Sequence, residues 1–130
     1  MTNKPSTKIN LFDCATAQKV IGQEKFLDSF KTILNHGAYC QGPETKELDE
    51  KLANFAGTKY CSTCGSGTDA LTLALMAWGV KSGDAVFVSS FTFVASAEAP
   101  VLLGATPIFV DSDPNTYNMN PEDLKKAIAE

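Results

Sequence analysis

The stretch Gly65-Ser66-Gly67-Thr68-Asp69-Ala70 decides how the chain is organised. It lies between an apolar, strand-like run (Lys59 to Cys64) and a helical pattern (Asp69 to Trp78). Glycines allow backbone amides to approach an anion closely, and the amino end of a helix favours negative charge. The sequence therefore predicts a phosphate-binding turn, to which Ser66 and Thr68 add hydroxyl donors.

Composition excludes several classes of function. The chain has 130 residues, of which 44% are hydrophobic, enough for one core. The formal net charge of −4 and the lack of a basic stripe argue against a nucleic-acid partner. No apolar run has membrane-spanning length, and Met1 to Asn10 lack the apolar core of a secretory signal, so we expect a cytoplasmic protein without a membrane partner.

The second half alternates strand and helix patterns. The predicted strands are Tyr60 to Cys64, Ala85 to Ser89 and Thr106 to Val110, and the predicted helices are Asp69 to Trp78 and Phe93 to Leu103. We interpret this as a parallel βαβαβ unit, in which ligands bind at the carboxyl ends of the strands. The glycine turn, the stretch Ser89 to Phe93, and Asp111 should meet at that edge. Asn120 should cap a last helix opened by Pro121.

The first half is predicted to be helical, and a loop interrupts it. Phe26, Phe30 and Leu34 recur at four-residue spacing within a helix from Gln18 to Leu34 that ends at Gly37. A second helix opens at Pro43 and ends at Gly57, with Leu48, Leu52 and Phe55 expected to face inward. The loop from Gly37 to Pro43 offers Tyr39 and Gln41 as ligand contacts or as plain connector residues. We divide the chain into residues 1–57, the helical segment with this loop, and residues 58–130, the βαβαβ part.

The four cysteines are Cys14, Cys40, Cys61 and Cys64. The spacing Cys61-Ser-Thr-Cys64 fits C-x-x-C, but residues three apart on a strand point to opposite faces and chelate a metal poorly. No second such pair exists, and His36 is the only histidine. We expect free, buried thiols and no metal site, with redox or zinc roles as the alternative.

A dinucleotide-binding module is a second interpretation of the glycine turn, because Gly65 to Ala70 also fits G-x-G-x-x-A. That fingerprint requires an acidic residue at the end of the next strand, and this strand ends Val88-Ser89-Ser90. The missing acid makes a Rossmann cofactor site the weaker hypothesis.

The chain resembles the amino-terminal third of the DegT/DnrJ/EryC1/StrS aminotransferases. The resemblance rests on five motifs in order: Gly37-x-Tyr39-x-x-Gly42-Pro43-Glu44, Gly65-Ser66-Gly67-Thr68-Asp69-Ala70-Leu71, Gly83-Asp84, Phe91-Thr92-Phe93, and Gly104-Ala-Thr-Pro-Ile-Phe-Val-Asp111. It implies the large domain of the fold-type I, aspartate aminotransferase-like fold, an α/β fold of three layers. It also implies a pyridoxal 5'-phosphate enzyme that moves an amino group from glutamate to a keto group on a nucleotide-linked sugar.

The resemblance also assigns site residues. The cofactor phosphate would be held at Gly67, Thr68 and Asp69, the cofactor ring would stack on Phe93, and Tyr39 would border the sugar pocket. Each has a plainer explanation. Asp69 in a first helical turn stabilises the helix dipole without any ligand, and its charge would repel a phosphate, so we expect its N–H to matter more. Phe93 can equally be a core aromatic at a helix start.

In the family, the lysine that bonds the cofactor and the acid that pairs with the pyridine nitrogen lie beyond position 130. Lys125, Lys126 and Asp111 match neither position, so this chain should contain no catalytic residue and should be inactive alone. We then expect exposed apolar surface and an open sheet edge. The complete form is expected to be a homodimer acting in surface-polysaccharide pathways on UDP- or dTDP-linked keto sugars. A non-catalytic interaction domain is the remaining alternative.

Overall fold

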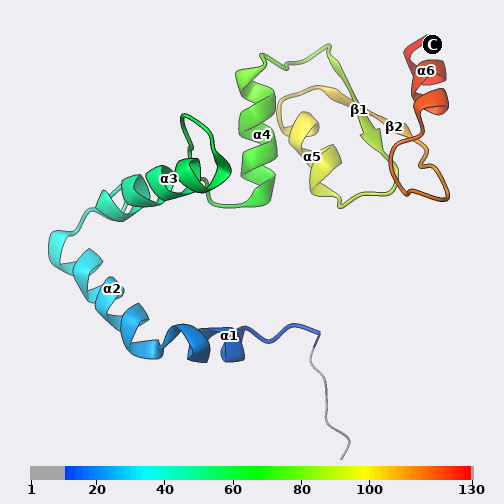
Figure 1. Cartoon of the computed structure of the whole chain (residues 1–130). Coiled ribbons are helices and arrows are strands. Elements are labelled where there is room, and N and C mark those ends of the chain that lie inside the picture. The colour runs from blue at the N-terminus through cyan, green and yellow to red at the C-terminus, as the bar shows by residue number, and fades with distance from the viewer. Residues whose placement is uncertain (1–10, 130) are drawn as a thin grey trace, which may run out of the picture. The chain divides into compact units, whose positions relative to one another are not determined.

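A computed structural model describes residues 11–129 (Figure 1). Met1 to Asn10, where we expect no secretory signal, lie outside the described residues. The chain forms two compact units, which divide between Cys61 and Ser62. Each unit is described by itself.

The first unit contains the helices α1 (Cys14–Ile21), α2 (Gln23–His36) and α3 (Pro43–Ala56). The single helix predicted from Gln18 to Leu34 is wrong, because Gly22 separates two helices with a φ of 96°. A positive φ is easy for glycine and unfavourable for other residues, so the chain turns there. The predicted ends are confirmed: Gly37 closes α2 and Gly57 closes α3, both in the left-handed conformation, and Pro43 opens α3.

The apolar faces of this unit are open. We predicted that Leu48, Leu52 and Phe55 face inward, and this is wrong for the described chain, since they are 47%, 39% and 92% exposed. The buried residue of α3 is Ala53. Helical periodicity marks an apolar face, but burial needs a second apolar surface against it, and no other described helix of this unit supplies one.

The second unit begins with α4 (Gly67–Ala77) and continues through β1 (Ala85–Ser89), α5 (Ala95–Leu102) and β2 (Thr106–Val110) to α6 (Pro121–Ala129). The strands β1 and β2 pair in parallel with Phe87 opposite Ile108, and α5 forms the crossover between them (Figure 1). The small core consists of side chains of β1, α5 and β2 and the residue before β2: Val88, Ala95, Ala99, Pro100, Ala105 and Val110. The predicted α/β class with parallel strands is confirmed.

The first of the three predicted strands is absent from the described residues. Tyr60 to Cys64 form no ladder, so the parallel unit is βαβ and not βαβαβ. A strand exists only when its N–H and C=O groups pair with a neighbour, and β1 pairs only with β2 among the described elements. The expected open edge and exposed apolar side chains are therefore both present.

The helices of this unit also differ from their predicted bounds. α4 begins two residues early because Ser66 caps it, and α5 begins at Ala95 and not at Phe93. Pro100 lies within α5 and is fully buried. The predicted cap of α6 is confirmed, because the Asn120 side-chain oxygen accepts a hydrogen bond from the Glu122 N–H at 2.9 Å.

Candidate functional site

The glycine turn forms the amino end of α4. Ser66 is extended and its Oγ accepts a hydrogen bond from the Asp69 N–H at 3.1 Å, while its carbonyl accepts from the Ala70 N–H. Within the described residues, the N–H groups of Gly67 and Thr68 and the Thr68 hydroxyl donate no hydrogen bond. Three donors at a helix amino end are therefore available to an anion.

At the turn, the open space favours phosphate binding and the charge of Asp69 opposes it. A Cβ placed on Gly67 would meet nothing within 4 Å, so the surface beside that residue is open. The Asp69 carboxylate folds back over the turn, and its Oδ2 lies 3.1 Å from where a Cβ of Gly65 would be. The open surface and free donors fit a phosphate, but the Asp69 charge weakens its binding. The Asp69 N–H, which we expected to hold the phosphate, is already bonded to Ser66.

A cleft of about 340 Å³ lies between α4, β1 and α5. Its walls are mostly apolar and include Leu71 and Trp78. The hydroxyl groups of Ser89, Thr92 and Ser96 supply its polar contacts, and those of Thr92 and Ser96 are 2.9 Å apart. Apolar walls with a few polar groups are typical of sites for small organic molecules.

Phe93 lies on the turn between β1 and α5, and its carbonyl accepts the N–H of Ser96. Phe93 is 77% exposed, so it is not a core aromatic of the described chain. An exposed aromatic face at this turn suits stacking against a flat ring, which contributes about 0.5–1.5 kcal/mol beyond burial.

The carboxyl ends of β1 and β2 are joined through three consecutive residues. Ser89 bonds Ser112 at 2.8 Å, and the Ser90 hydroxyl donates to the Asp111 carboxylate at 3.3 Å. Phe91 packs against Tyr117. The predicted meeting of the Ser89 to Phe93 stretch with Asp111 is confirmed. In Figure 1 the amino end of α4 faces the same way as the carboxyl end of β1.

The loop after β2 is a compact turn centred on Asp113. The N–H groups of Thr116 and Asn115 donate to the Asp113 carboxylate and hold its pKa below the usual value. Ser112 and Met119 form an isolated antiparallel bridge at its base. No motif in the sequence indicated this bridge.

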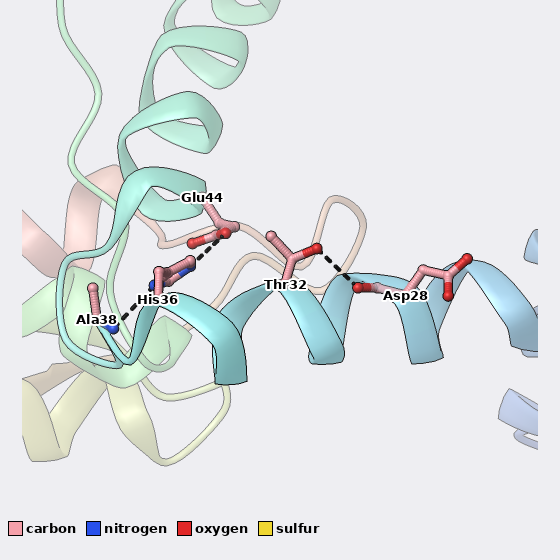
Figure 2. A network of polar contacts seen from close by, with 5 residues as sticks. All are labelled: Asp28, Thr32, His36, Ala38 and Glu44. Atoms are coloured by element: carbon pink, nitrogen blue, oxygen red, sulfur yellow. Dashed lines mark hydrogen bonds and ion pairs between the residues drawn. The ribbon is translucent and has the colours of Figure 1, made fainter.

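In the first unit, Tyr39 lies on the loop between α2 and α3 and is 69% exposed. Figure 2 shows the His36 ring between this loop and α3: the Ala38 N–H donates to Nδ1 at 3.0 Å, and Nε2 lies 2.9 Å from Glu44 Oε1. The hydrogen bond from His36 lowers the pKa of the Glu44 carboxyl. The sequence analysis used His36 only as the single histidine in the argument against a metal site. A contact between residues eight apart across a loop follows no local sequence rule.

The cysteine prediction is half right. All four thiols are free, as expected, but Cys14, Cys40 and Cys64 are exposed and Cys61 is half-buried. The prediction of burial is wrong because the segments that carry them lie outside the small core. Among residues 11–129, no group of three or more His, Cys, Asp or Glu side chains is placed to hold a metal ion. In the same range, no helix is long and apolar enough to cross a bilayer.

Comparison with known proteins identifies the family. The model of the DegT/DnrJ/EryC1/StrS aminotransferase family matches residues 20–130. The chain belongs to this family. It is 49% identical over 106 residues to the UDP-2-acetamido-2-deoxy-3-oxo-D-glucuronate aminotransferase of Pseudomonas aeruginosa, covering 82% of this chain and 30% of that protein. It is 39% identical to a UDP-N-acetyl-3-dehydro-alpha-D-glucosamine 3-aminotransferase of Acidithiobacillus ferrooxidans, with 82% and 29% covered.

Solved structures of this family show the same fold. A DegT/DnrJ/EryC1/StrS aminotransferase from Brucella abortus superposes with a TM-score of 0.82 at 41% identity, over 94% of this chain and 32% of that one. The DesV structure from S. venezuelae, in complex with a ketimine intermediate, gives a TM-score of 0.84 at 30% identity over 92% and 32%. The fold is therefore that of the fold-type I pyridoxal phosphate enzymes, and the chain spans about a third of these relatives.

The family match leaves the individual site residues as predictions. Gly67, Thr68 and Asp69 share the first turn of α4, and Phe93 lies in the same unit at the carboxyl end of β1. Tyr39 belongs to the other unit. Ser66, which we expected to act as a donor, accepts a hydrogen bond as the cap of α4, and its own proton stays available.

Proposed function

We propose that this chain is the cofactor-phosphate part of an enzyme that transfers an amino group from glutamate to a keto group of a nucleotide-linked sugar. The observation that carries the proposal is the 49% identity to a UDP-sugar aminotransferase over a segment that includes a turn with free anion-binding donors. The named substrates of the relatives favour a UDP-linked N-acetylated keto sugar.

Pyridoxal phosphate, when bound, supplies the electron-withdrawing ring that carries an amino group between donor and acceptor. The residues of this chain bind and orient it. The N–H groups of Gly67 and Thr68 and the Thr68 hydroxyl hold the phosphate, where the dipole of α4 favours negative charge. Phe93 stacks on one face of the ring and keeps water from it. The cleft beside α4 and β1 receives apolar parts of the bound molecules.

Chemistry at the reacting carbon requires groups that we place outside residues 1–130: the lysine that bonds the cofactor and the acid that pairs with its ring nitrogen. We therefore propose that the 130-residue chain is inactive alone. The complete enzyme works as a homodimer in the cytoplasm. In that enzyme the rest of the fold covers the apolar faces of α2, α3 and α4 that are exposed in this chain.

The test uses the protein encoded by the complete reading frame that contains these residues, below called the full-length protein. It is titrated with pyridoxal phosphate and then with glutamate while the absorption spectrum is recorded. We expect a cofactor band at the edge of the visible range that is lost when glutamate is added. Production of an amino sugar from a UDP-linked keto sugar would complete the proof.

A pair of matched variants tests the phosphate turn. Thr68→Val removes the hydroxyl that we assign to the phosphate, and Thr72→Val removes a hydroxyl one turn later that bonds the Thr68 carbonyl at 2.9 Å. We expect Thr68→Val to raise the dissociation constant of pyridoxal phosphate about tenfold, the loss of one hydrogen bond to a charged group. Equal effects of the two variants would contradict the assignment.

A further inference from the structure

The loop that joins α2 to α3 is constrained far more than an exposed connector requires. Gly37 has a φ of 66° and Gln41 a φ of 50°, a left-handed conformation that costs free energy in a residue other than glycine. A Cβ on Gly42 would collide with the Ala38 carbonyl oxygen, so only glycine fits there. The Tyr39 N–H donates to the Gly37 carbonyl at 3.1 Å. These constraints together fix the backbone on both sides of Tyr39.

His36 adds a side-chain bridge to this loop (Figure 2). Its Nδ1 accepts the Ala38 N–H and its Nε2 meets Glu44 Oε1. A ring with its proton on Nε2 satisfies both contacts, donating to Glu44 and accepting from Ala38. One imidazole thus joins the last residue of α2, the loop, and the first turn of α3.

This bridge differs from the other ion pairs within residues 11–129. Those pairs join side chains three or four residues apart in one helix, and their lysines are at least 70% exposed. The His36 and Glu44 side chains belong to two helices and are 28% and 41% exposed. An exposed pair within one helix changes stability little. The His36–Glu44 pair instead joins two helices across a loop, so it restrains the backbone between them.

The residue that this geometry presents is Tyr39. Tyr39 is 69% exposed, so no described residue packs over it and explains why its backbone is held. Holding an exposed aromatic ring in one orientation on a loop is useful when the ring must contact a ligand. Cys40 beside it is also exposed and forms no disulfide.

We propose that His36 and Glu44 are positioning residues that hold Tyr39 in place to receive the sugar part of a nucleotide-sugar substrate. The inference rests on the proposed function, because the substrate class comes from there. Neither His36 nor Glu44 touches the substrate. His36 acts through the Ala38 N–H, and Glu44 acts by fixing the His36 ring against α3.

The experiment compares five variants of the full-length protein: His36→Ala, His36→Gln, Glu44→Ala, Glu44→Gln and Tyr39→Ala. Glutamine at position 36 keeps one donor and one acceptor, and glutamine at position 44 keeps the acceptor, so both are conservative variants. Glu47→Ala is the control, because it removes an exposed ion pair of α3 that lies outside the loop. Two readouts are used: amide hydrogen exchange at Ala38, and the dissociation constant of UDP-N-acetylglucosamine by calorimetry.

We expect Tyr39→Ala, His36→Ala and Glu44→Ala each to raise that dissociation constant about tenfold, and the two glutamine variants to stay within about twofold of the parent. The Ala38 amide should exchange faster in His36→Ala and stay protected in His36→Gln. The double variant His36→Ala, Glu44→Ala should bind no worse than either single variant, because both break one bridge.

Faster Ala38 exchange with unchanged sugar-nucleotide binding would overturn the positioning role, and unchanged exchange would overturn the bridge itself. A parent protein that binds no UDP-N-acetylglucosamine would also overturn the positioning role. Failure of the proposed function is seen separately, as a full-length protein that binds the sugar nucleotide but shows no cofactor band and no amino transfer.

Discussion

The rings of Phe91 and Tyr117 lie with their centroids 5.4 Å apart and their planes inclined by 40°. Tyr117 has a φ of 60°, and its N–H donates to the Asp113 carbonyl at 2.8 Å. The compact loop after β2 therefore holds Tyr117 in an unfavourable backbone conformation against Phe91. Phe91 lies two positions before Phe93. Strain of this kind persists where surrounding contacts determine the conformation.

Replacing Tyr117 tests this pairing. Tyr117→Leu keeps the left-handed strain and removes the ring, so we expect the free energy of unfolding of the full-length protein to fall by about 0.5–1 kcal/mol. Tyr117→Phe keeps the ring and should match the parent within about 0.3 kcal/mol. Urea unfolding measures both. If Tyr117→Leu were as stable as Tyr117→Phe, the ring pair would contribute nothing.

Gly67→Ala should change stability and binding in opposite directions. A Cβ at this position meets nothing within 4 Å, and alanine is the better helix former, so we expect stability to rise by a few tenths to about 1 kcal/mol. The same methyl group would occupy the open surface where we place the phosphate, so affinity for pyridoxal phosphate should fall. Thermal unfolding and cofactor titration of one sample measure both. A stabilised variant with unchanged affinity would place the phosphate elsewhere.

Asp69→Asn tests the electrostatic cost at the turn. The Asp69 carboxylate lies over Gly65, in the same turn as the free donors of Gly67 and Thr68. Removing one negative charge about 4 Å from a phosphate in water is worth about 1 kcal/mol, so we expect inorganic phosphate to bind about fivefold more tightly. Stability should fall by about 0.3–1 kcal/mol, because the helix loses its first-turn acid.

The control for this variant is Glu122→Gln, which removes an acid from the first turn of α6. It should lower stability by a similar amount and leave phosphate affinity unchanged. Competition of inorganic phosphate against pyridoxal phosphate measures the affinity. Weaker phosphate binding in Asp69→Asn would show that the carboxylate orients the turn more than it repels the anion.

Local rules predicted the parts of this structure that depend on local chemistry. Gly37, Gly57 and Asn120 end or begin helices where expected, because a left-handed glycine or a side-chain cap needs only its own neighbours. The strands β1 and β2 match their predicted bounds, since each is a short apolar run that finds its partner across one crossover.

The failures depend on partners beyond the local sequence. Tyr60 to Cys64 has a strand-like pattern but pairs with none of the described strands, and the apolar face of α3 has no covering surface from the described part of its own unit. The Ser66 cap used the Asp69 N–H that we assigned to the phosphate, because a cap and an anion compete for the same donors. The bridge from His36 to Glu44 depends on how the loop between them closes, which composition does not reveal.

The pH dependence of stability gives a direct test of that bridge. The hydrogen bond from His36, with a smaller contribution from the Glu44 backbone N–H, lowers the pKa of Glu44 below its usual value. In the unfolded chain this carboxyl has its usual pKa and binds a proton first as the pH falls. Between that value and the lower folded pKa, the unfolded state binds more protons. The free energy of unfolding therefore decreases as the pH is lowered through this range. Above the usual value, the contribution of the bridge is fully present.

Glu44→Gln removes this titration and keeps the hydrogen-bond acceptor. We therefore expect the difference in unfolding free energy between the parent and Glu44→Gln to be constant above the usual glutamate range and to shrink as the pH is lowered through it. Asp13 and Asp113, whose pKa values are also lowered, contribute with the same sign in both proteins and cancel in the difference. Urea unfolding between roughly pH 3 and 7 measures the two curves. Parallel curves over that range would mean that Glu44 is not bonded to His36 in solution.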